Sequence, residues 1–200
     1  MRTVLLATSN AGKGIEIRES LAGLPLRLMM LQYLPSVVPP SPEGEGTFAG
    51  NARQKALHYH RHTGMPTIAD DSGILVEALA GELGVATRRW GAGPQASDEE
   101  WIAHFLQCMK QEKNKRASFV CVLAFAHEQG VEMFEGRCEG SITEDLEAGY
   151  LPGLPISACF KPEGCDKVFS ALTVEEKKSA FGLFEKFSHF NLYIHSGRKI

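Results

Sequence analysis

No stretch of this 200-residue sequence approaches the ~20 consecutive apolar residues that a membrane-spanning helix needs. The apolar run near the N-terminus, Val4 to Ala7, is far too short for a secretory signal peptide. The five cysteines include no Cys-x-x-Cys pair and no zinc-type spacing, and their odd number is typical of a reducing compartment. We therefore expect a cytoplasmic protein that has no membrane partner.

An excess of positive charge is also missing. The 21 Lys and Arg residues are outnumbered by 24 Asp and Glu residues, which gives a net charge of −3. No overall basic field would attract polymeric nucleic acid, so a ligand that carries phosphates must be met by local cations. Hydrophobic residues make up 44% of the chain, which is ordinary for a soluble globular protein. We expect a single domain over residues 1–200.

The order of apolar and polar segments predicts an α/β fold. Residues 3–7 form an apolar run, a helix-type pattern follows from Ile15 to Leu24, and residues 26–31 are a second strand candidate. This β-α-β opening is typical of an α/β sheet. Further along, the pattern predicts a helix over residues 48–62 with Thr47 as its N-cap, and a helix that Ser97-Asp98-Glu99-Glu100 opens with a capping box. It also predicts a helix from Thr173 and a β-hairpin of residues 116–126 and 131–142.

The most informative motif is Ala69-Asp70-Asp71-Ser72-Gly73, which follows a short apolar run. If that run is a strand that ends at the acids, Asp70 and Asp71 point to opposite faces, and only one of them enters a given pocket. A carboxylate at a strand end, beside a turn with accessible backbone N–H groups, can hold a hard cation and a phosphate. The alternative is a solvated Asp-Asp-Ser-Gly turn.

Two further segments are candidates for binding phosphate. Residues 8–13, Thr-Ser-Asn-Ala-Gly-Lys, lie between a predicted strand and a predicted helix. Backbone N–H groups at a helix start and a lysine in the first turn make an anion site, although the spacing is not that of a Walker loop. Asn51 and Lys55 are four residues apart and share one helical face. A generic turn and an ordinary surface helix remain the alternatives.

Taken in order and with their spacing, these motifs resemble the inosine triphosphate pyrophosphatase family, which acts on non-standard purine nucleoside triphosphates. The resemblance extends from residue 3 to about residue 178. Its later marks are Gly84 to Gly91 with Arg89, Arg116 to Val122, Glu135-Gly136 with Gly140, and Glu175-Glu176-Lys177.

The resemblance implies an elongated α/β fold with a mixed central sheet, flanking helices and a substrate cleft between two lobes. It implies Mg²⁺-dependent hydrolysis of triphosphates such as ITP, dITP and XTP between the α- and β-phosphates, which releases the monophosphate and pyrophosphate. It also implies a homodimer.

The resemblance assigns roles to individual residues. Asp71 would be the general base or a metal ligand, and Lys13 would join it in catalysis. Glu43 would hold Mg²⁺, with Glu45 close enough to compete for that role. The substrate-binding set would be Thr8, Ser9, Asn10, Lys13, Asn51, Lys55, Ser72, Arg89, Leu154 and Lys177.

The chain departs from the family pattern at the end that recognises the base. The family's Gly-Phe-Gly-Tyr-Asp-Pro is here residues 153–158, so the aromatic is replaced by Leu154 and the acid by Ser157. The family's Ser-His-Arg motif is missing, and the segment 186–200 has weak helical periodicity. We expect an intact triphosphate site and reduced or altered base selectivity. The alternative is a nucleotide-binding homologue with weak turnover.

Overall fold

The computed structural model describes residues 2–42, 44, 46–93 and 95–181. The side chains of Arg88 and Arg89 are also outside the description. The strands are β1 Arg2–Leu6, β2 Leu26–Met30, β3 Thr67–Val76, β4 Arg116–His127, β5 Gly130–Ile142 and β6 Phe160–Pro162. The helices are α1 Ala11–Ser20, α2 Phe48–Thr63, α3 Asp98–Lys110 and α4 Val174–Phe181.

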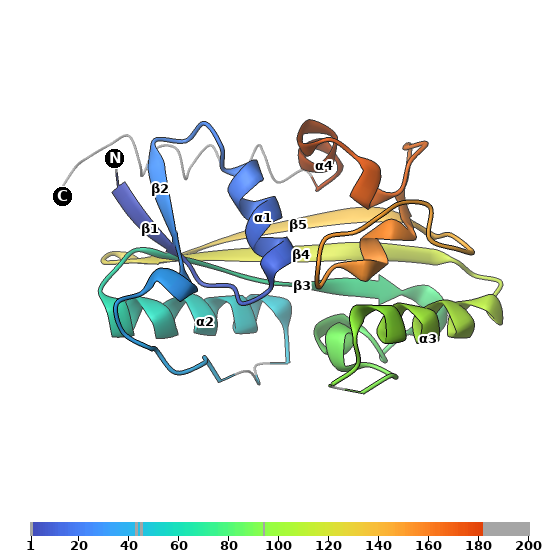
Figure 1. The fold of residues 1–200 in the computed structure, drawn as a ribbon, viewed down its shortest axis with the longest axis horizontal. Helices are drawn as coiled ribbons and strands as arrows, with labels where there is room; N and C mark the ends of the chain where they lie inside the picture. The colour runs from blue at the N-terminus through green and yellow to red at the C-terminus, as the bar shows by residue number, and fades with distance from the viewer. Residues whose placement is uncertain (1, 43, 45, 94, 182–200) are drawn as a thin grey trace.

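The strands form one mixed sheet in the order β2-β1-β3-β4-β5-β6, and the molecule is elongated along it (Figure 1). β1 is parallel to β2 and β3, while the pairs from β3 to β6 are antiparallel. The predicted β-α-β opening and the predicted hairpin are both confirmed. β1 pairs with β3 only at Leu5 with Thr67 and Leu6 with Ile68. Beyond Ile68, that edge of β3 is therefore not covered by β1.

The prediction that the strand ends at the acidic pair is wrong. β3 continues through Asp70 and Asp71 to Val76, and all ten of its residues are in register with β4. Asp-Asp-Ser-Gly resembles a turn when only local propensity is considered. Pairing with a long partner strand overrides that propensity, so the acids lie in the middle of a strand.

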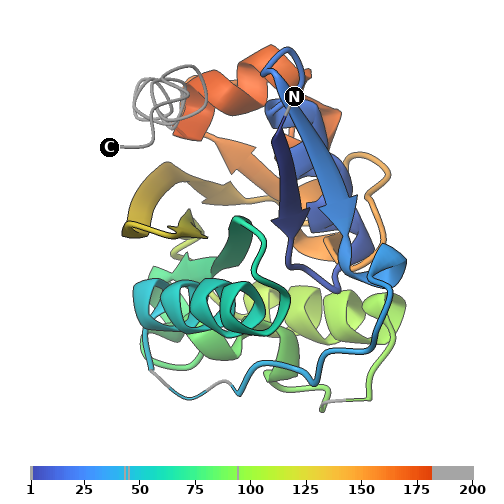
Figure 2. The same cartoon turned by 90° about the vertical axis from the view of Figure 1, so that its left-hand side faces the viewer.

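Helices cover both faces of the sheet (Figures 1 and 2). α1 packs Ile17 and Leu21 on one face against Val4, Leu6 and Leu123. On the other face α2 packs the small residues Ala52 and Ala56, with Tyr59, against Leu5 and Val122. A third cluster unites the second half of β3 with α3, where Trp101 and Phe105 are buried. The uncovered edge of β3 lies between these helical layers.

The helices α2 and α3 begin where the sequence predicts, whereas α1 begins at Ala11, before the predicted pattern from Ile15. Thr47 caps α2, since its hydroxyl accepts a hydrogen bond from the Gly50 N–H at 3.0 Å. Ser97 and Glu100 form the expected capping box of α3. In the part of the chain that is described, no helix combines the length and apolarity that crossing a bilayer requires. The segment 186–200 lies outside the described residues.

Candidate active site

A polar cavity of about 440 Å³ opens where β1 ends and β3 continues alone. After Leu6 the chain leaves the sheet through the phosphate loop, which we define as residues 8–13, and enters α1. Side chains from this loop, α2, β3 and the 3-10 segment Gly84–Arg89 therefore converge. The lining includes Thr8, Ser9, Asn10, Lys13, Lys55, Tyr59, Asp70, Asp71, Ser72 and Thr87.

Asn10 organises the phosphate loop. As the N-cap of α1, its Oδ1 accepts a hydrogen bond from the Lys13 backbone N–H at 3.0 Å. Its own N–H donates to the Thr8 hydroxyl at 3.3 Å, and its Nδ2 donates to the Gly153 carbonyl at 3.0 Å. The loop thus has a fixed shape at the positive end of a helix.

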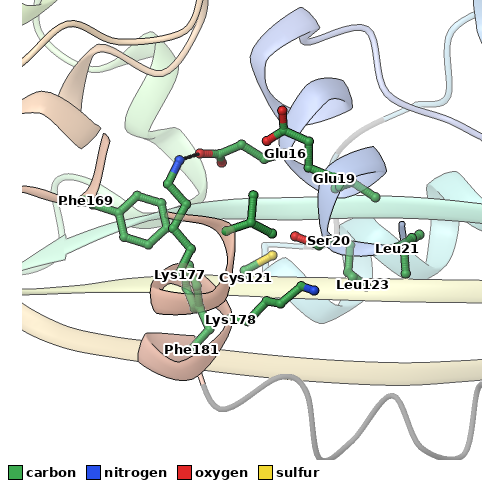
Figure 3. Close-up of a pocket in the computed structure, with 12 residues that line it drawn as sticks. Glu16, Glu19, Ser20, Leu21, Cys121, Leu123, Phe169, Lys177, Lys178 and Phe181 are labelled. Carbon is green, nitrogen blue, oxygen red and sulfur yellow. Dashed lines mark hydrogen bonds and ion pairs between the residues drawn. The ribbon is translucent and has the colours of Figure 1, made fainter. Parts of the chain in front are cut away.

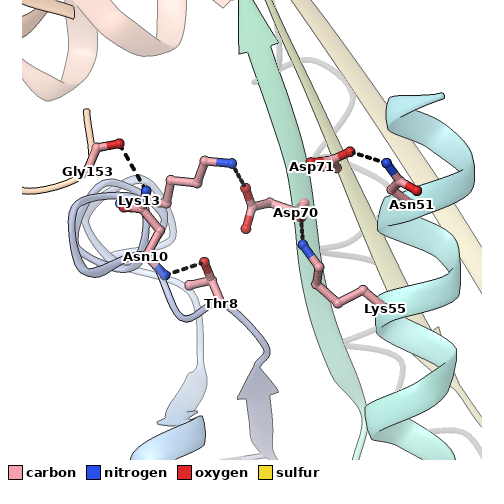
Figure 4. Close-up of polar contacts among 8 residues, drawn as sticks. All are labelled: Thr8, Asn10, Lys13, Asn51, Lys55, Asp70, Asp71 and Gly153. Carbon is pink, nitrogen blue, oxygen red and sulfur yellow. Dashed lines mark hydrogen bonds and ion pairs between the residues drawn. The ribbon is translucent and has the colours of Figure 1, made fainter. Parts of the chain in front are cut away.

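Lys13 and Asp70 form a buried ion pair, with 2.9 Å between Nζ and Oδ2 (Figure 4). Burial opposes the charge of Asp70, but Lys13 and Lys55 together outweigh burial and lower the pKa of this carboxyl. Burial likewise opposes the charge of Lys13, and Asp70 reverses the effect and raises the pKa of Lys13. Lys55 Nζ donates to the Asp70 backbone carbonyl at 2.9 Å. Both lysine side chains are therefore held in place beside the cavity.

Asp71 occupies a different environment from its neighbour. Figure 4 shows its carboxylate on the opposite face of β3 from that of Asp70, toward α2, where Asn51 Nδ2 donates to Oδ2 at 2.9 Å. Burial raises the pKa of Asp71, and the Asn51 hydrogen bond opposes this effect only in part. The half-buried Asp71 is thus a stronger base than an ordinary aspartate.

The expected alternation of the two carboxylates is confirmed, but its predicted consequence is wrong. Asp70 and Asp71 point to opposite faces, yet both line the same cavity. The cavity opens at the uncovered edge of β3 and so reaches both faces of the strand. One cavity therefore contains a paired acid and a separate, more basic one.

A smaller apolar cavity of about 130 Å³ adjoins the polar one and shares Asn10, Lys13, Ser72 and Thr87 with it. Leu154 lines this apolar cavity, and its assigned role in substrate binding stays a prediction. The aromatic walls of this cavity, Phe119 on β4 and Trp101 on α3, were not predicted. Residues 153–156 also line it.

Phe119 could have been found only through strand register. Its strand was predicted, but the pairing of Phe119 with Ile74, two residues from Ser72 on β3, depends on contacts distant in the sequence. Trp101 fits equally well as a core residue of α3 when the helix is considered alone. The sequence around Phe119 and Trp101 contains no pattern that would indicate a role of either residue in binding.

Some predicted residues lie apart from this arrangement. Lys177 pairs with Glu16 at 2.8 Å and lines a separate pocket of about 90 Å³ between α1 and α4 (Figure 3). Glu43 and Glu45 lie outside the described residues, as does the side chain of Arg89. The roles assigned to all of these residues stay predictions.

The chemistry of the polar cavity suits a hard divalent cation. No three His, Cys, Asp or Glu side chains gather as a metal site within the described ranges. Mg²⁺ needs only one or two carboxylates, because waters and phosphate oxygens complete its shell. The Asp71 carboxylate on the cavity wall, with the Ser72 hydroxyl beside it, fits that requirement.

Comparison with known proteins adds an independent finding. A family model described as the Ham1 family matches residues 4–182. The dITP/XTP pyrophosphatase of Deinococcus deserti is 38% identical over 183 residues, which cover 89% of this chain and 82% of that protein. The dITP/XTP pyrophosphatase of Thermus thermophilus is 39% identical over 181 residues, 87% of this chain and 83% of that protein.

Solved structures agree with the sequence comparison. A HAM1 protein from Coxiella burnetii superposes with a TM-score of 0.76 at 27% identity, covering 98% of this chain and 100% of that one. A nucleoside-triphosphatase, dITP/XTP pyrophosphatase, from Mycobacterium abscessus gives a TM-score of 0.67 at 29% identity, covering 94% and 97%.

Proposed function

The chain belongs to the Ham1 family, and we propose that it hydrolyses non-standard purine nucleoside triphosphates such as dITP and XTP to the monophosphate and pyrophosphate. One observation about the site supports this proposal most directly. Two lysines and two differently held carboxylates surround a single polar cavity, next to an apolar cavity with aromatic walls. The first cavity suits a triphosphate and the second suits a purine.

Lys13 and Lys55 would bind the triphosphate. Their ammonium groups are already positioned, Lys13 by Asp70 and Lys55 by the strand backbone. As pyrophosphate departs, negative charge grows on its oxygens, and fixed cations stabilise that charge without reorganising. The start of α1 adds the positive end of its dipole on the same side.

Asp71 is the residue best suited to accept a proton from the attacking water. Its raised pKa makes it a better base, and its half-buried position on the cavity wall leaves it within reach of a substrate. The Asn51 side chain fixes the orientation of the carboxylate. Asp70, whose pKa is lowered, stays ionised and keeps Lys13 in place.

We propose Mg²⁺ as the metal, held by Asp71 with help from Glu43. Bound there, Mg²⁺ would offset phosphate charge and favour the ionised form of nearby groups. Further proposals that rest on the family resemblance are a homodimer and a cytoplasmic location.

The test is pyrophosphate release from ITP, dITP, XTP, GTP and ATP, each with Mg²⁺ and with a chelator. We expect turnover that needs the metal and favours the deaminated bases. Tight nucleotide binding without pyrophosphate release from any substrate would instead support the binding homologue with weak turnover.

A further inference from the structure

Residues 152–155, which we call the lip, line the apolar cavity through Gly153, Leu154 and Pro155 and lie directly against the phosphate loop. The Gly12 N–H donates to the Pro152 carbonyl at 3.1 Å, and Asn10 Nδ2 donates to the Gly153 carbonyl at 3.0 Å. These bonds connect segments more than a hundred residues apart. The wall that would face the base is thus joined to the loop that would face the phosphates.

Two glycines permit this close approach. A Cβ on Gly12 would lie 2.6 Å from the Pro152 carbonyl oxygen, and a Cβ on Gly153 would lie 2.5 Å from Asn10 Nδ2. Gly153 also has φ +81°, a conformation that other residues rarely adopt. The lip therefore has little freedom to shift against the phosphate loop without breaking its hydrogen bonds.

A third contact holds the lip from α3. The Gly153 N–H donates to Asp98 Oδ2 at 2.5 Å. Asp98 is the first residue of α3, where a negative charge is favourable, and a carboxylate accepts a stronger hydrogen bond than a neutral group does. Asp98 is absent from the linings of both the polar and the apolar cavity. The Gly153 hydrogen bond connects Asp98 to the wall of the apolar cavity through the lip.

We propose that Asp98 is a positioning residue for base recognition, which acts by fixing Gly153 and with it Leu154 against the purine. This inference deepens the proposed function and rests on it. Ser157, at the place of the family's acid, supports the same wall, because its hydroxyl donates to the Leu154 carbonyl at 2.6 Å. Gly153 and Leu154 of the lip are thus each held by a side chain that does not line the apolar cavity.

The phosphate loop does not depend on Asp98 for its own shape. Its cap, from the Lys13 N–H to Asn10 Oδ1, is local, and Lys13 is positioned by Asp70. Loss of Asp98 should therefore weaken recognition of the base and leave recognition of the phosphates unchanged. Inorganic tripolyphosphate, which has no base, separates the two effects.

The experiment compares Asp98→Ala, Asp98→Asn and Glu99→Gln with the unmodified protein. Glu99→Gln removes one negative charge from the same helical turn and is the matched control. Measurements are kcat and KM for ITP and ATP, the dissociation constant of ITP, inhibition by tripolyphosphate, and the thermal midpoint. For Asp98→Ala we expect KM and the dissociation constant for ITP to rise about tenfold, the usual scale for a charge-assisted hydrogen bond.

Inhibition by tripolyphosphate should stay within about twofold in Asp98→Ala, whereas affinity for ATP should fall along with affinity for ITP, because Leu154 offers an apolar surface to either base. Asp98→Asn, which keeps an acceptor oxygen, should recover most of the ITP affinity. The inference is overturned if ITP affinity is unchanged in Asp98→Ala, or if tripolyphosphate inhibition weakens to the same extent. If the unmodified protein releases no pyrophosphate from any substrate, the proposed function fails, while the ITP dissociation constants still decide the role of Asp98.

Discussion

The polar cavity and the apolar cavity are adjacent, but they are held in shape by different forces. Charges organise the polar one, where Lys13 pairs with Asp70 and Asn51 orients Asp71. Backbone contacts at Gly12 and Gly153 organise the apolar one. We therefore expect phosphate binding to depend on a few charged side chains, and base recognition to depend on how distant segments pack.

The largest effect should come from the acid that faces α2. Asp71→Asn keeps the shape of the side chain but removes its ability to accept a proton. We expect pyrophosphate release to fall by ~10²-fold or more, the usual scale for a general base. In the unmodified protein without metal, the Asp71 carboxyl followed by NMR should titrate above the ordinary aspartate pKa, because burial raises its pKa, and added Mg²⁺ should lower that pKa.

The folding stability of Asp71→Asn supplies the control. A raised pKa in the folded protein stabilises the fold only while the group is protonated, and this contribution is lost as the pH rises through the folded pKa. At pH 7 the ionised Asp71 therefore costs stability, and the asparagine variant should unfold at an equal or higher denaturant concentration. Lower stability together with lost activity would contradict the assignment of Asp71 as the base.

Asp70→Asn should lower folding stability more than activity, which is the reverse of the result expected for Asp71→Asn. The variant leaves the buried Lys13 ammonium without its counter-ion, and breaking a buried pair costs about 3–5 kcal/mol. Chemical denaturation at pH 7 measures this loss, and residual activity per folded molecule should exceed that of Asp71→Asn. Equal loss of activity per folded molecule in the two variants would refute the division of roles.

The folding stability that the Lys13–Asp70 ion pair contributes should depend on pH in a defined direction. Because the folded pKa of Asp70 is lowered, its stabilisation is present above the ordinary aspartate pKa and is lost as the pH falls through the folded value. For Lys13, whose pKa is raised, stabilisation is present below the ordinary lysine pKa and is lost as the pH rises through the folded value. The free energy of unfolding of Asp70→Asn should approach that of the unmodified protein at strongly acidic pH.

A smaller effect is expected for the lysine that contacts the strand backbone. Lys55→Ala should weaken inhibition by tripolyphosphate by roughly tenfold at low salt, because a fixed cation is lost beside the phosphates. The difference from the unmodified protein should shrink as salt is raised from 0.05 to 1 M, roughly following the shorter screening length. An unchanged inhibition constant at low salt would show that Lys55 does not contact the phosphates.

The sequence predicted local features better than contacts between distant segments, for a physical reason. Helix caps such as Thr47 and Ser97 depend on contacts within three residues, and both were predicted. The end of β3 was misplaced, because its pairing with β4 is set by a strand that begins some forty residues later. The contact of Asp98 with Gly153 spans 55 residues and has no local pattern. Charged motifs are visible in sequence, whereas packing between distant backbones is not.

The smallest expected effect tests whether aromatic walls compensate for the replaced aromatic at Leu154. Phe119 lines the apolar cavity together with Leu154 and Trp101. Phe119→Leu keeps an apolar side chain but removes the ring, and aromatic pairs contribute about 0.5–1.5 kcal/mol beyond buried area. We therefore expect kcat/KM for ITP to fall by about two- to tenfold, with inhibition by tripolyphosphate unchanged.

Leu154→Ala is the matched comparison, because it removes buried surface from the same cavity without removing a ring. Leu154 can bury the surface of either purine, so this variant should reduce affinity for ITP and ATP alike. Shape alone separates related substrates by about 10–200-fold. Phe119→Leu should reduce both as well, since every purine presents a face to stack on. If the unmodified protein prefers ITP over ATP by more than about a thousandfold, shape and stacking cannot account for it, and a polar group must then bond the purine edge. Neither Asp98 nor Ser157 lines the apolar cavity, so that bond would have to come from another residue.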